Sequence, residues 1–164
     1  MSPGFGIFVF GICVFFILLS MAAPTVNIFI PTYEPKPGHL RKALECVIRQ
    51  TFQDWTVLIH DDASPKSNVR EIVGGYLSDP RVSLKQSERR LGIGGNWNAC
   101  LRHADAPFVE YLFQDDAWEP EYLQKSVAVL LADPSVGFCA ANHRYADDDD
   151  NDIGGRYGEI KALR

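Results

Sequence analysis

Two pairs of adjacent carboxylates stand out in this sequence. Asp115 and Asp116 follow the apolar run "EYLF", and Asp61 and Asp62 end the run "WTVLIHDD". Neighbouring carboxylates repel each other when both are ionised, but they become favourable ligands around a hard divalent cation. Mg²⁺ or Mn²⁺ binds one or two carboxylates together with phosphate oxygens. The later pair therefore predicts a metal-assisted site for a diphosphate, and a carboxylate of the earlier pair could accept a hydrogen bond from a nucleotide base.

Bulk composition restricts the class of partner. The chain has 164 residues, 46% hydrophobic and 23% charged, which is typical of one globular domain. Its net charge of −5 argues against a broad face for nucleic acid, so we expect no nucleic-acid partner. An acidic protein that binds phosphates needs a metal ion or a local basic cluster. The 4 cysteines lack C-x-x-C spacing, which favours reduced thiols in the cytoplasm over a zinc site.

The N-terminal segment, residues 3–23, contains no charged residue. Its length reaches the roughly 20 residues that a membrane-spanning helix needs. Three interpretations stay open, namely a membrane anchor, a cleaved signal peptide, and a translation start at Met21. An anchor would hold the domain at the cytoplasmic face of the membrane, because Lys36, Arg41 and Lys42 lie on its C-terminal side. We therefore expect a cytoplasmic protein with a membrane association if this segment is an anchor.

After Met21, strand-like apolar runs alternate with segments of helical spacing. The predicted strands cover 25–33, 55–62, 81–86, 107–113 and 136–141. The predicted helices cover 39–50, 69–77, 95–103 and 122–131, of which the second is weakened by two glycines. Single helices between strands imply right-handed crossovers. The expected fold class is α/β, with a mostly parallel sheet and helices on both faces.

Polar residues collect where the predicted strands end. In open parallel sheets, ligands bind beyond the carboxyl ends of the strands. Any single polar cluster there is weak evidence, because loops are polar anyway. Two strands that each end in Asp-Asp are stronger evidence, since a turn rarely needs that pair. The residues placed at this edge are Pro31, Thr32, Tyr33, Asp61, Asp62, Arg89, Arg90, Asp115 and Asp116.

Three ordered stretches resemble the family 2 glycosyltransferases, which have the GT-A fold. The first strand and turn of that family are similar to "VNIFIPTYEP", and its next helix and strand are similar to "LRKALECVIRQTFQDWTVLIHDDAS". The stretch that ends in the family's metal-binding motif resembles "LGIGGNWNACLRHADAPFVEYLFQDDAWEPEYLQ". The resemblance covers about residues 24–143. It implies a GT-A fold that is incomplete at the C-terminus, with this part forming the nucleotide-sugar-binding domain.

The resemblance also implies roles for individual residues. It implies that Asp62 reads the base with support from Asp61, that Asp115 lies at the ribose and metal, and that Asp116 coordinates the metal. Nucleotide-binding residues carried over are Pro31, Thr32, Tyr33, Asp61, Asp62, Asp115 and either Arg89 or Arg90, of which Arg90 is our candidate. Two positions depart from the family pattern. Glu34 stands where Asn is frequent, and Phe113 replaces the first acid of the metal motif, which leaves the adjacent pair to bind the metal.

The implied activity is transfer of a sugar from a nucleotide-diphosphate sugar to an acceptor hydroxyl, with inversion and with Mg²⁺ or Mn²⁺ as cofactor. A UDP-sugar is the favoured donor, and the acceptor is an unknown glycan, lipid or small molecule. The family's catalytic base lies further along the chain, so we expect it beyond Arg164 and expect little transfer by these residues alone. Residues 144–164 are then an acidic turn and the start of an acceptor region.

Two alternatives to an enzyme stay open. A non-catalytic nucleotide-binding remnant would keep the same motifs. A receiver-type phosphoacceptor domain is less consistent with the sequence. Receivers carry their acid pair after the first strand and a lysine after the fifth, whereas here the pair follows the second predicted strand and residues 136–143 contain no lysine. The acidic run at 147–152 predicts a solvated hairpin. It does not fit a calcium-binding EF-hand, since Asp152 and Gly158 stand where that loop needs Gly and Glu.

Overall fold

The computed structural model describes residues 24–141, 144–147, 151–156 and 161–163. Within these ranges, no helix is long and apolar enough to cross a membrane. The apolar segment at 3–23 lies outside the described residues, so its three interpretations all stay open.

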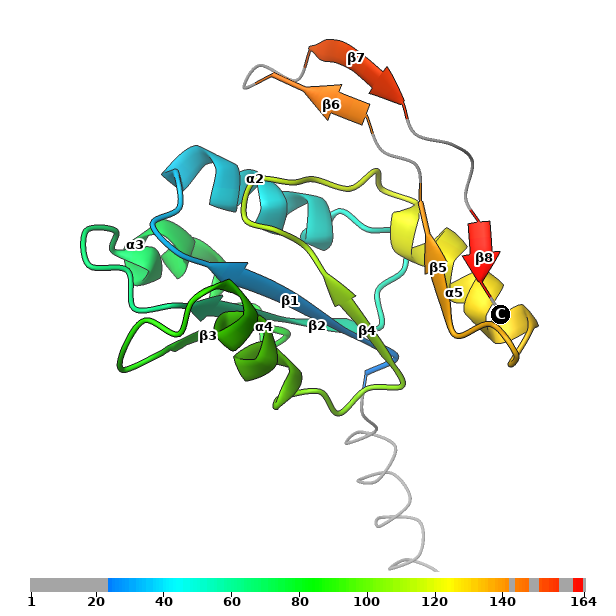
Figure 1. The fold of residues 1–164 in the computed structure, drawn as a ribbon, viewed down its shortest axis with the longest axis horizontal. Helices are drawn as coiled ribbons and strands as arrows, with labels where there is room; N and C mark the ends of the chain where they lie inside the picture. Colours follow the sequence, from blue (N-terminus) through cyan, green and yellow to red (C-terminus); the bar gives the residue numbers. More distant parts are fainter. Residues whose placement is uncertain (1–23, 142–143, 148–150, 157–160, 164) are drawn as a thin grey trace, which may run out of the picture. The chain divides into compact units, whose positions relative to one another are not determined.

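Four parallel strands form the central sheet (Figure 1). They are β1 (Val26–Thr32), β2 (Trp55–Asp61), β3 (Val82–Gln86) and β4 (Phe108–Tyr111), in the order β3-β2-β1-β4. All three ladders between them are parallel. Every residue of β1 is buried, which explains why its sequence is an apolar run and does not alternate. The predicted mostly parallel sheet is confirmed.

The four predicted helices are all present, with shifted ends. They are α2 (Pro37–Ile48), α3 (Val69–Val73), α4 (Ile93–Leu101) and α5 (Tyr122–Ala132). The second predicted helix is cut short, because Gly74 and Gly75 lie in a 3₁₀ turn, η1 (Gly74–Tyr76), instead of continuing α3. Proline stands in the first turn of α2, where its missing N–H costs nothing.

The chain forms two compact units that interleave along the sequence. Of the described residues, the first unit contains 24–33, 54–64 and 77–111, and the second contains 34–53, 65–76 and those from 112 onward. In the first unit, α4 packs on β1 and β2. In the second unit, α2 packs on α3, and α5 packs on β5 (Phe138–Ala140). The predicted boundaries at residues 23 and 143 stay a prediction.

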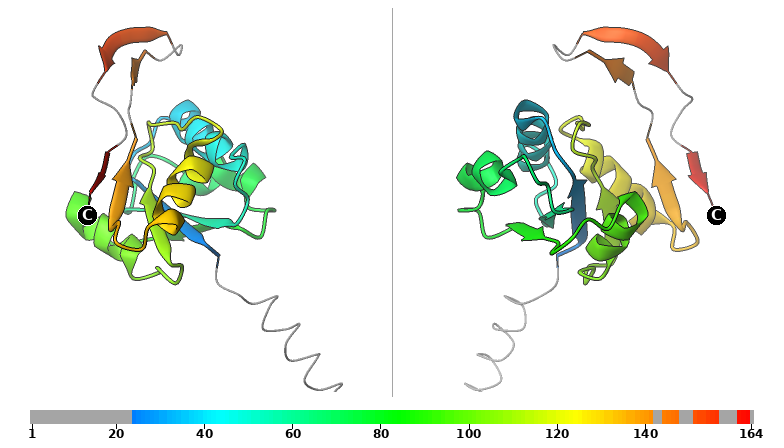
Figure 2. Two further views of the ribbon diagram at one scale, coloured as in Figure 1. Left: turned by 90° about the vertical axis from the view of Figure 1, so that its right-hand side faces the viewer. Right: turned by 60° about the vertical axis from the view of Figure 1, so that its left-hand side comes forward.

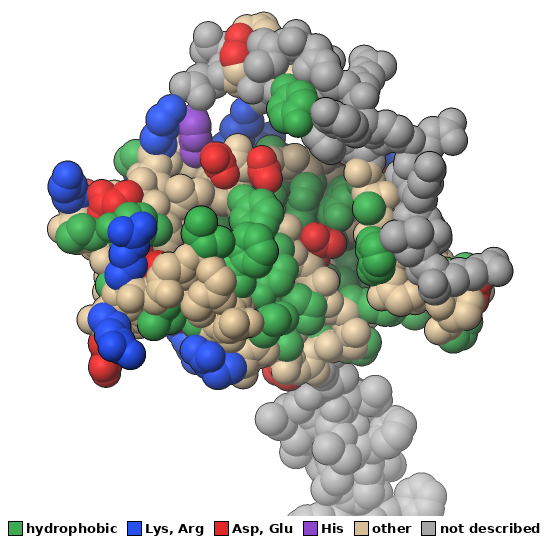
Figure 3. Space-filling view, in the orientation of Figure 1, with side chains coloured by type: hydrophobic (Ala, Val, Ile, Leu, Met, Phe, Trp, Pro, Cys, Tyr) green, Lys and Arg blue, Asp and Glu red, His purple; other side chains and the backbone are tan. Residues whose placement is uncertain are grey.

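Helix α4 has an unusual distribution of side chains. Its buried positions are Asn96, Ala99 and Cys100, whereas Ile93, Trp97 and Leu101 are exposed on the other side. Hydrophobic side chains are visible at the surface of the molecule in Figure 3. The buried Cys100 of α4 packs against Phe29 of β1 and Leu58 of β2 in a core cluster. Burial raises the pKa of its thiol to about 12.

The C-terminal strands differ from the sequence-based expectation. The strand predicted at 136–141 is present as β5, but it pairs antiparallel with β8 (Lys161–Leu163) instead of with the parallel sheet. The tail showed no strong period, yet it also contains β6 (Arg144–Ala146) and β7 (Asp152–Arg156), which pair antiparallel (Figure 2). Backbone hydrogen bonds between short antiparallel strands need no apolar period.

Strands β6 and β7 pair antiparallel on either side of the predicted acidic turn, of which residues 148–150 lie outside the described ranges. Where the two strands meet this turn, the Asn151 backbone N–H donates to the Asp147 carboxylate over 2.9 Å. The Asp147 backbone N–H in turn donates to the Asn151 carbonyl over 3.0 Å. These reciprocal bonds make Asp147 a turn residue within the hairpin.

Candidate functional site

Asp61, the last residue of β2, has a buried and fully engaged carboxylate. One oxygen accepts hydrogen bonds from the Ser64 backbone N–H (3.1 Å) and hydroxyl (2.6 Å). The other oxygen accepts from the Gln86 side-chain amide over 2.8 Å. Only 1% of Asp61 is exposed to solvent. This carboxylate ties the turn after β2 to the end of β3.

Asp62 holds the backbone that leads into α4. Its two carboxylate oxygens accept from the Leu91 N–H (2.6 Å) and the Gly92 N–H (2.9 Å). Gly92 has φ +76°, a conformation that favours glycine. Asp62 itself is 2% exposed, and its own N–H donates to the Thr32 carbonyl over 2.9 Å. A carboxylate has about four acceptor sites, and these two bonds use one on each oxygen.

Two buried residues that the sequence analysis missed support the same edge. The Asn96 side-chain oxygen lies 2.6 Å from Nδ1 of His60. The Asn96 amide nitrogen donates to the carbonyls of Thr32 and His60, at 3.3 Å each. This network fixes the end of β1, where the predicted residue Thr32 lies, against α4. Asn96 stands on the buried face of an otherwise apolar helix, and this position alone could have indicated that it has a buried hydrogen-bonding role.

Tyr33 and Arg90 are brought together from different loops. The guanidinium carbon of Arg90 lies 4.0 Å from the centroid of the Tyr33 ring, which is a cation–π contact. Arg90 is exposed and is adjacent to Leu91, the residue whose N–H binds Asp62. Of the two candidate arginines, Arg90 is thus the one in contact with another predicted site residue. A flat ring with a guanidinium over it can bind a base or a phosphate oxygen.

Asp115 and Asp116 belong to the second unit, and both are exposed. The Asp116 N–H donates to the Phe113 carbonyl over 3.1 Å, so the pair lies in a turn. Among the described residues, no group of three or more His, Cys, Asp and Glu side chains is placed to hold a metal. Two carboxylates nevertheless fit Mg²⁺ or Mn²⁺, because these ions prefer oxygen ligands and complete their shell with water and phosphate.

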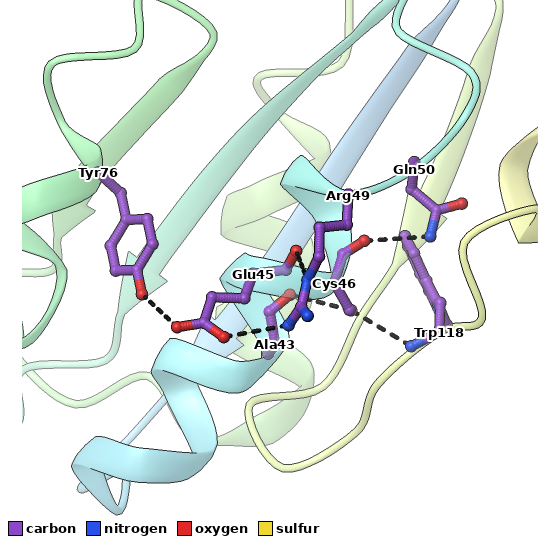
Figure 4. Close-up of polar contacts among 7 residues, drawn as sticks. All are labelled: Ala43, Glu45, Cys46, Arg49, Gln50, Tyr76 and Trp118. Atoms are coloured by element: carbon purple, nitrogen blue, oxygen red, sulfur yellow. Dashed lines mark hydrogen bonds and ion pairs between the residues drawn. The ribbon is translucent and has the colours of Figure 1, made fainter.

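The segment just after this pair is attached to the C-terminal end of α2 (Figure 4). The Gln50 amide donates to the Glu119 carbonyl over 2.9 Å and accepts from the Leu123 N–H over 2.9 Å. The backbone N–H of Trp118 donates to Sγ of Cys46 over 3.2 Å. Burial raises the pKa of the Cys46 thiol, so it stays neutral. The sequence analysis assigned no role to Gln50, although it lies inside a stretch quoted for the family resemblance.

Comparison with known proteins gives the same family. The Glycosyl transferase family 2 model matches residues 27–159. Succinoglycan biosynthesis protein ExoW of Rhizobium meliloti is 37% identical over 100 residues, which are 60% of this chain and 31% of ExoW. The Escherichia coli protein WfgD, named as a UDP-Glc:alpha-D-GlcNAc-diphosphoundecaprenol beta-1,3-glucosyltransferase, is 26% identical over 132 residues, which are 80% of this chain and 50% of WfgD. The chain spans half or less of the length of both relatives.

Solved structures share the fold. The mannosyltransferase PcManGT from Pyrobaculum calidifontis, solved with GDP-Man and Mn²⁺, matches with a TM-score of 0.65 and 24% identity, over 76% of this chain and 37% of PcManGT. S. aureus TarS 1-349, solved with UDP, matches with a TM-score of 0.58 and 24% identity, over 66% of this chain and 32% of TarS. The GT-A fold expected from the sequence is therefore confirmed. With the family model matching most of its length, the chain belongs to glycosyltransferase family 2.

Proposed function

We propose that this chain forms the donor-binding part of a metal-dependent, inverting glycosyltransferase that uses a nucleotide-diphosphate sugar. The observation that carries the proposal is the connection between Tyr33, Asp62 and Arg90 in the first unit. Asp62 binds the backbone N–H of Leu91, next to Arg90, and the Arg90 guanidinium lies over Tyr33. An acceptor carboxylate, an aromatic ring and a cation are the groups that a base and a phosphate require.

Each side chain has a distinct proposed task. Asp62 accepts a hydrogen bond from the base while Asp61 keeps the turn in place, and Arg90 pairs with the base or a phosphate oxygen. Asp115 and Asp116 are the carboxylates that would hold Mg²⁺ or Mn²⁺. When bound, such an ion offsets the charge that develops on the departing diphosphate.

The proposed reaction is a single displacement at the anomeric carbon. The acceptor oxygen forms the new bond, the bond to the nucleotide diphosphate breaks, and the hydroxyl proton passes to a general base. We assign no base among the described residues. WfgD is named for a UDP-linked donor and TarS was solved with UDP, whereas PcManGT was solved with GDP-Man and Mn²⁺, which supports testing UDP first. The acceptor class, whether glycan, lipid or small molecule, stays open.

Calorimetry with UDP and GDP, with Mn²⁺ or with a chelator, tests this proposal. We expect binding only when Mn²⁺ is present, and tighter binding of UDP than of GDP. Equal affinity in the chelator would contradict the metal requirement, and failure of both nucleotides to bind would contradict the donor site itself.

Arg90→Gln should weaken UDP binding by about tenfold, as expected for loss of a charged partner. Arg102→Gln is a matched control, because this exposed arginine lies at the opposite end of α4.

A further inference from the structure

We infer that Gln50 is a positioning residue for the Asp115–Asp116 turn, which it controls through the segment Trp118–Leu123. This inference rests on the metal-binding role proposed above for the acid pair. Gln50 is 1% exposed, although its side chain is polar and lies at the end of a surface helix. A buried carboxamide is costly unless its donors and acceptor are paired, so its partners indicate what it does.

The pairing of Gln50 is complete and spans two parts of the second unit. Its amide nitrogen donates to the Cys46 carbonyl (3.1 Å) and to the Glu119 carbonyl (2.9 Å). Its amide oxygen accepts from the Leu123 N–H (2.9 Å). Both N–H groups and the oxygen are thus used, and the side chain joins the last turn of α2 to the first turn of α5.

Neighbouring residues of α2 and the following turn reinforce this attachment. The Thr51 N–H donates to the Pro120 carbonyl over 2.8 Å, and its hydroxyl donates to the Gln124 side chain over 2.7 Å. Sγ of Cys46 accepts from the Trp118 N–H. The attached segment therefore begins at Trp118, only two residues after Asp116.

This short distance along the chain links Gln50 to the candidate metal ligands. Asp115 and Asp116 are exposed, and the segment that follows them is fixed from Trp118 onward. Loss of the Gln50 bonds would loosen the backbone on the C-terminal side of the acid pair, which would then be held by the bonds of Cys46 and Thr51. Groups that orient metal ligands without touching the metal typically change metal affinity about 10- to 100-fold when they are removed.

The test is Mn²⁺ binding to the full chain in the presence of UDP, followed by electron paramagnetic resonance of the free ion. Gln50→Met keeps a similar volume but removes all three hydrogen bonds, and we expect it to weaken Mn²⁺ binding about 10- to 100-fold. Tyr76→Phe is the matched control. It removes a hydrogen bond of 3.1 Å to Glu45, on the other side of the same helix in Figure 4, and should leave Mn²⁺ affinity unchanged.

The outcomes separate this inference from the proposed function. If the unaltered chain binds no Mn²⁺ with UDP, the proposed metal role is wrong. If it binds Mn²⁺ and Gln50→Met binds equally well, the positioning inference is wrong. An equal loss in Tyr76→Phe would also overturn it, because general destabilisation would then explain both. If Gln50→Met does not fold, Thr51→Val decides, with a smaller loss of Mn²⁺ affinity expected because Gln50 is kept, and with no loss contradicting the inference.

Discussion

The two Asp-Asp pairs of this chain are identical in sequence and opposite in environment. Asp61 and Asp62 are buried, and their carboxylate oxygens accept hydrogen bonds from backbone and side-chain donors of the same unit. Asp115 and Asp116 are exposed in a turn. A dipeptide at the end of an apolar run therefore does not define a role by itself. The donors that surround it decide whether it organises the backbone or offers oxygen ligands.

The difference follows from where each pair lies in the fold. Strand β2 lies between β1 and β3, so its last residues are enclosed by the ends of two other strands. The loop from Leu91 to Gly92 supplies two further N–H groups to Asp62. The later pair follows Leu112 in the second unit, beyond the end of β4 at the edge of the sheet. The comparison predicts that mutations in the first pair change stability in addition to any loss of base binding, whereas mutations in the second change binding alone.

The largest expected effect is on stability, from Asp62→Ala. This change leaves the part-buried N–H groups of Leu91 and Gly92 without their charged acceptor, and hydrogen bonds to charged groups contribute about 1.5–3 kcal/mol each. We expect the free energy of unfolding to fall by about 3 kcal/mol, measured by urea denaturation. Asp115→Ala is the control, and it should stay within about 0.5 kcal/mol of the unaltered chain, as exposed substitutions usually do. Similar losses in both variants would remove the contrast between the pairs.

The next effect is on binding, from Asp116→Asn. Replacing one metal ligand should weaken Mn²⁺-dependent UDP binding by about 2–3 kcal/mol, in the range for losing a charged partner. Folding should survive, because the change relieves repulsion between neighbouring carboxylates. Calorimetry and thermal unfolding of the same sample measure both quantities. An unfolded variant, or one that binds as before, would show that this pair is structural or merely solvated.

Sequence reasoning located the strands and the edge where the polar residues gather. Apolar runs such as "VNIFIPT" are long enough to identify a buried strand, and strand ends follow from them. The partners of the side chains could not be predicted in the same way. Asp62 and Gly92 are 30 residues apart, and Gln50 and Glu119 are 69 apart. Such pairs depend on the packing of whole elements, which no local pattern encodes.

The C-terminal strands were missed for a related reason. Strand β7 contains Asp152 and two glycines, residues that are depleted in strands. Its pairing with β6 relies on backbone hydrogen bonds across a turn closed by Asp147 and Asn151. Propensity therefore predicted a turn between these strands, but it gave no sign of the strands themselves.

Alkaline pH should weaken the unit that contains the buried pair through Cys100, which lies on the helix that Asp62 holds. Its thiol pKa of about 12 in the folded chain exceeds the ordinary value of 9.0, because burial disfavours the thiolate. Between these values the unfolded chain loses the proton while the folded chain keeps it. The contribution of this thiol to the free energy of unfolding is therefore fully present below pH 9. It is lost as the pH rises from 9 toward 12, by about 1.4 kcal/mol per pH unit. Cys100→Ala should show a shallower decline in urea denaturation between pH 8.5 and 10.5, and an unchanged slope would contradict this.

The smallest expected effect comes from the backbone beside the buried pair. Ala63, directly after Asp62, has φ +56°, in the left-handed region that costs an L-residue about 1–2 kcal/mol. Ala63→Gly should therefore raise the free energy of unfolding by about 0.5–1 kcal/mol, after allowance for the greater freedom of glycine in the unfolded chain. Glu34 in the second unit has a similar φ of +49°.

Glu34→Gly relieves the same strain, but it removes a carboxylate that accepts from the backbone N–H groups of Lys66 (2.8 Å) and Ser67 (3.3 Å). We expect the free energy of unfolding of this variant to be unchanged or slightly lower. Each lost hydrogen bond removes about 0.5–1.5 kcal/mol of stability, which offsets the strain that glycine relieves. Parallel urea denaturation of the two variants measures the difference. Equal stabilisation would mean that the Glu34 bonds contribute nothing. Destabilisation by Ala63→Gly would mean that the turn after the buried pair is not strained in solution.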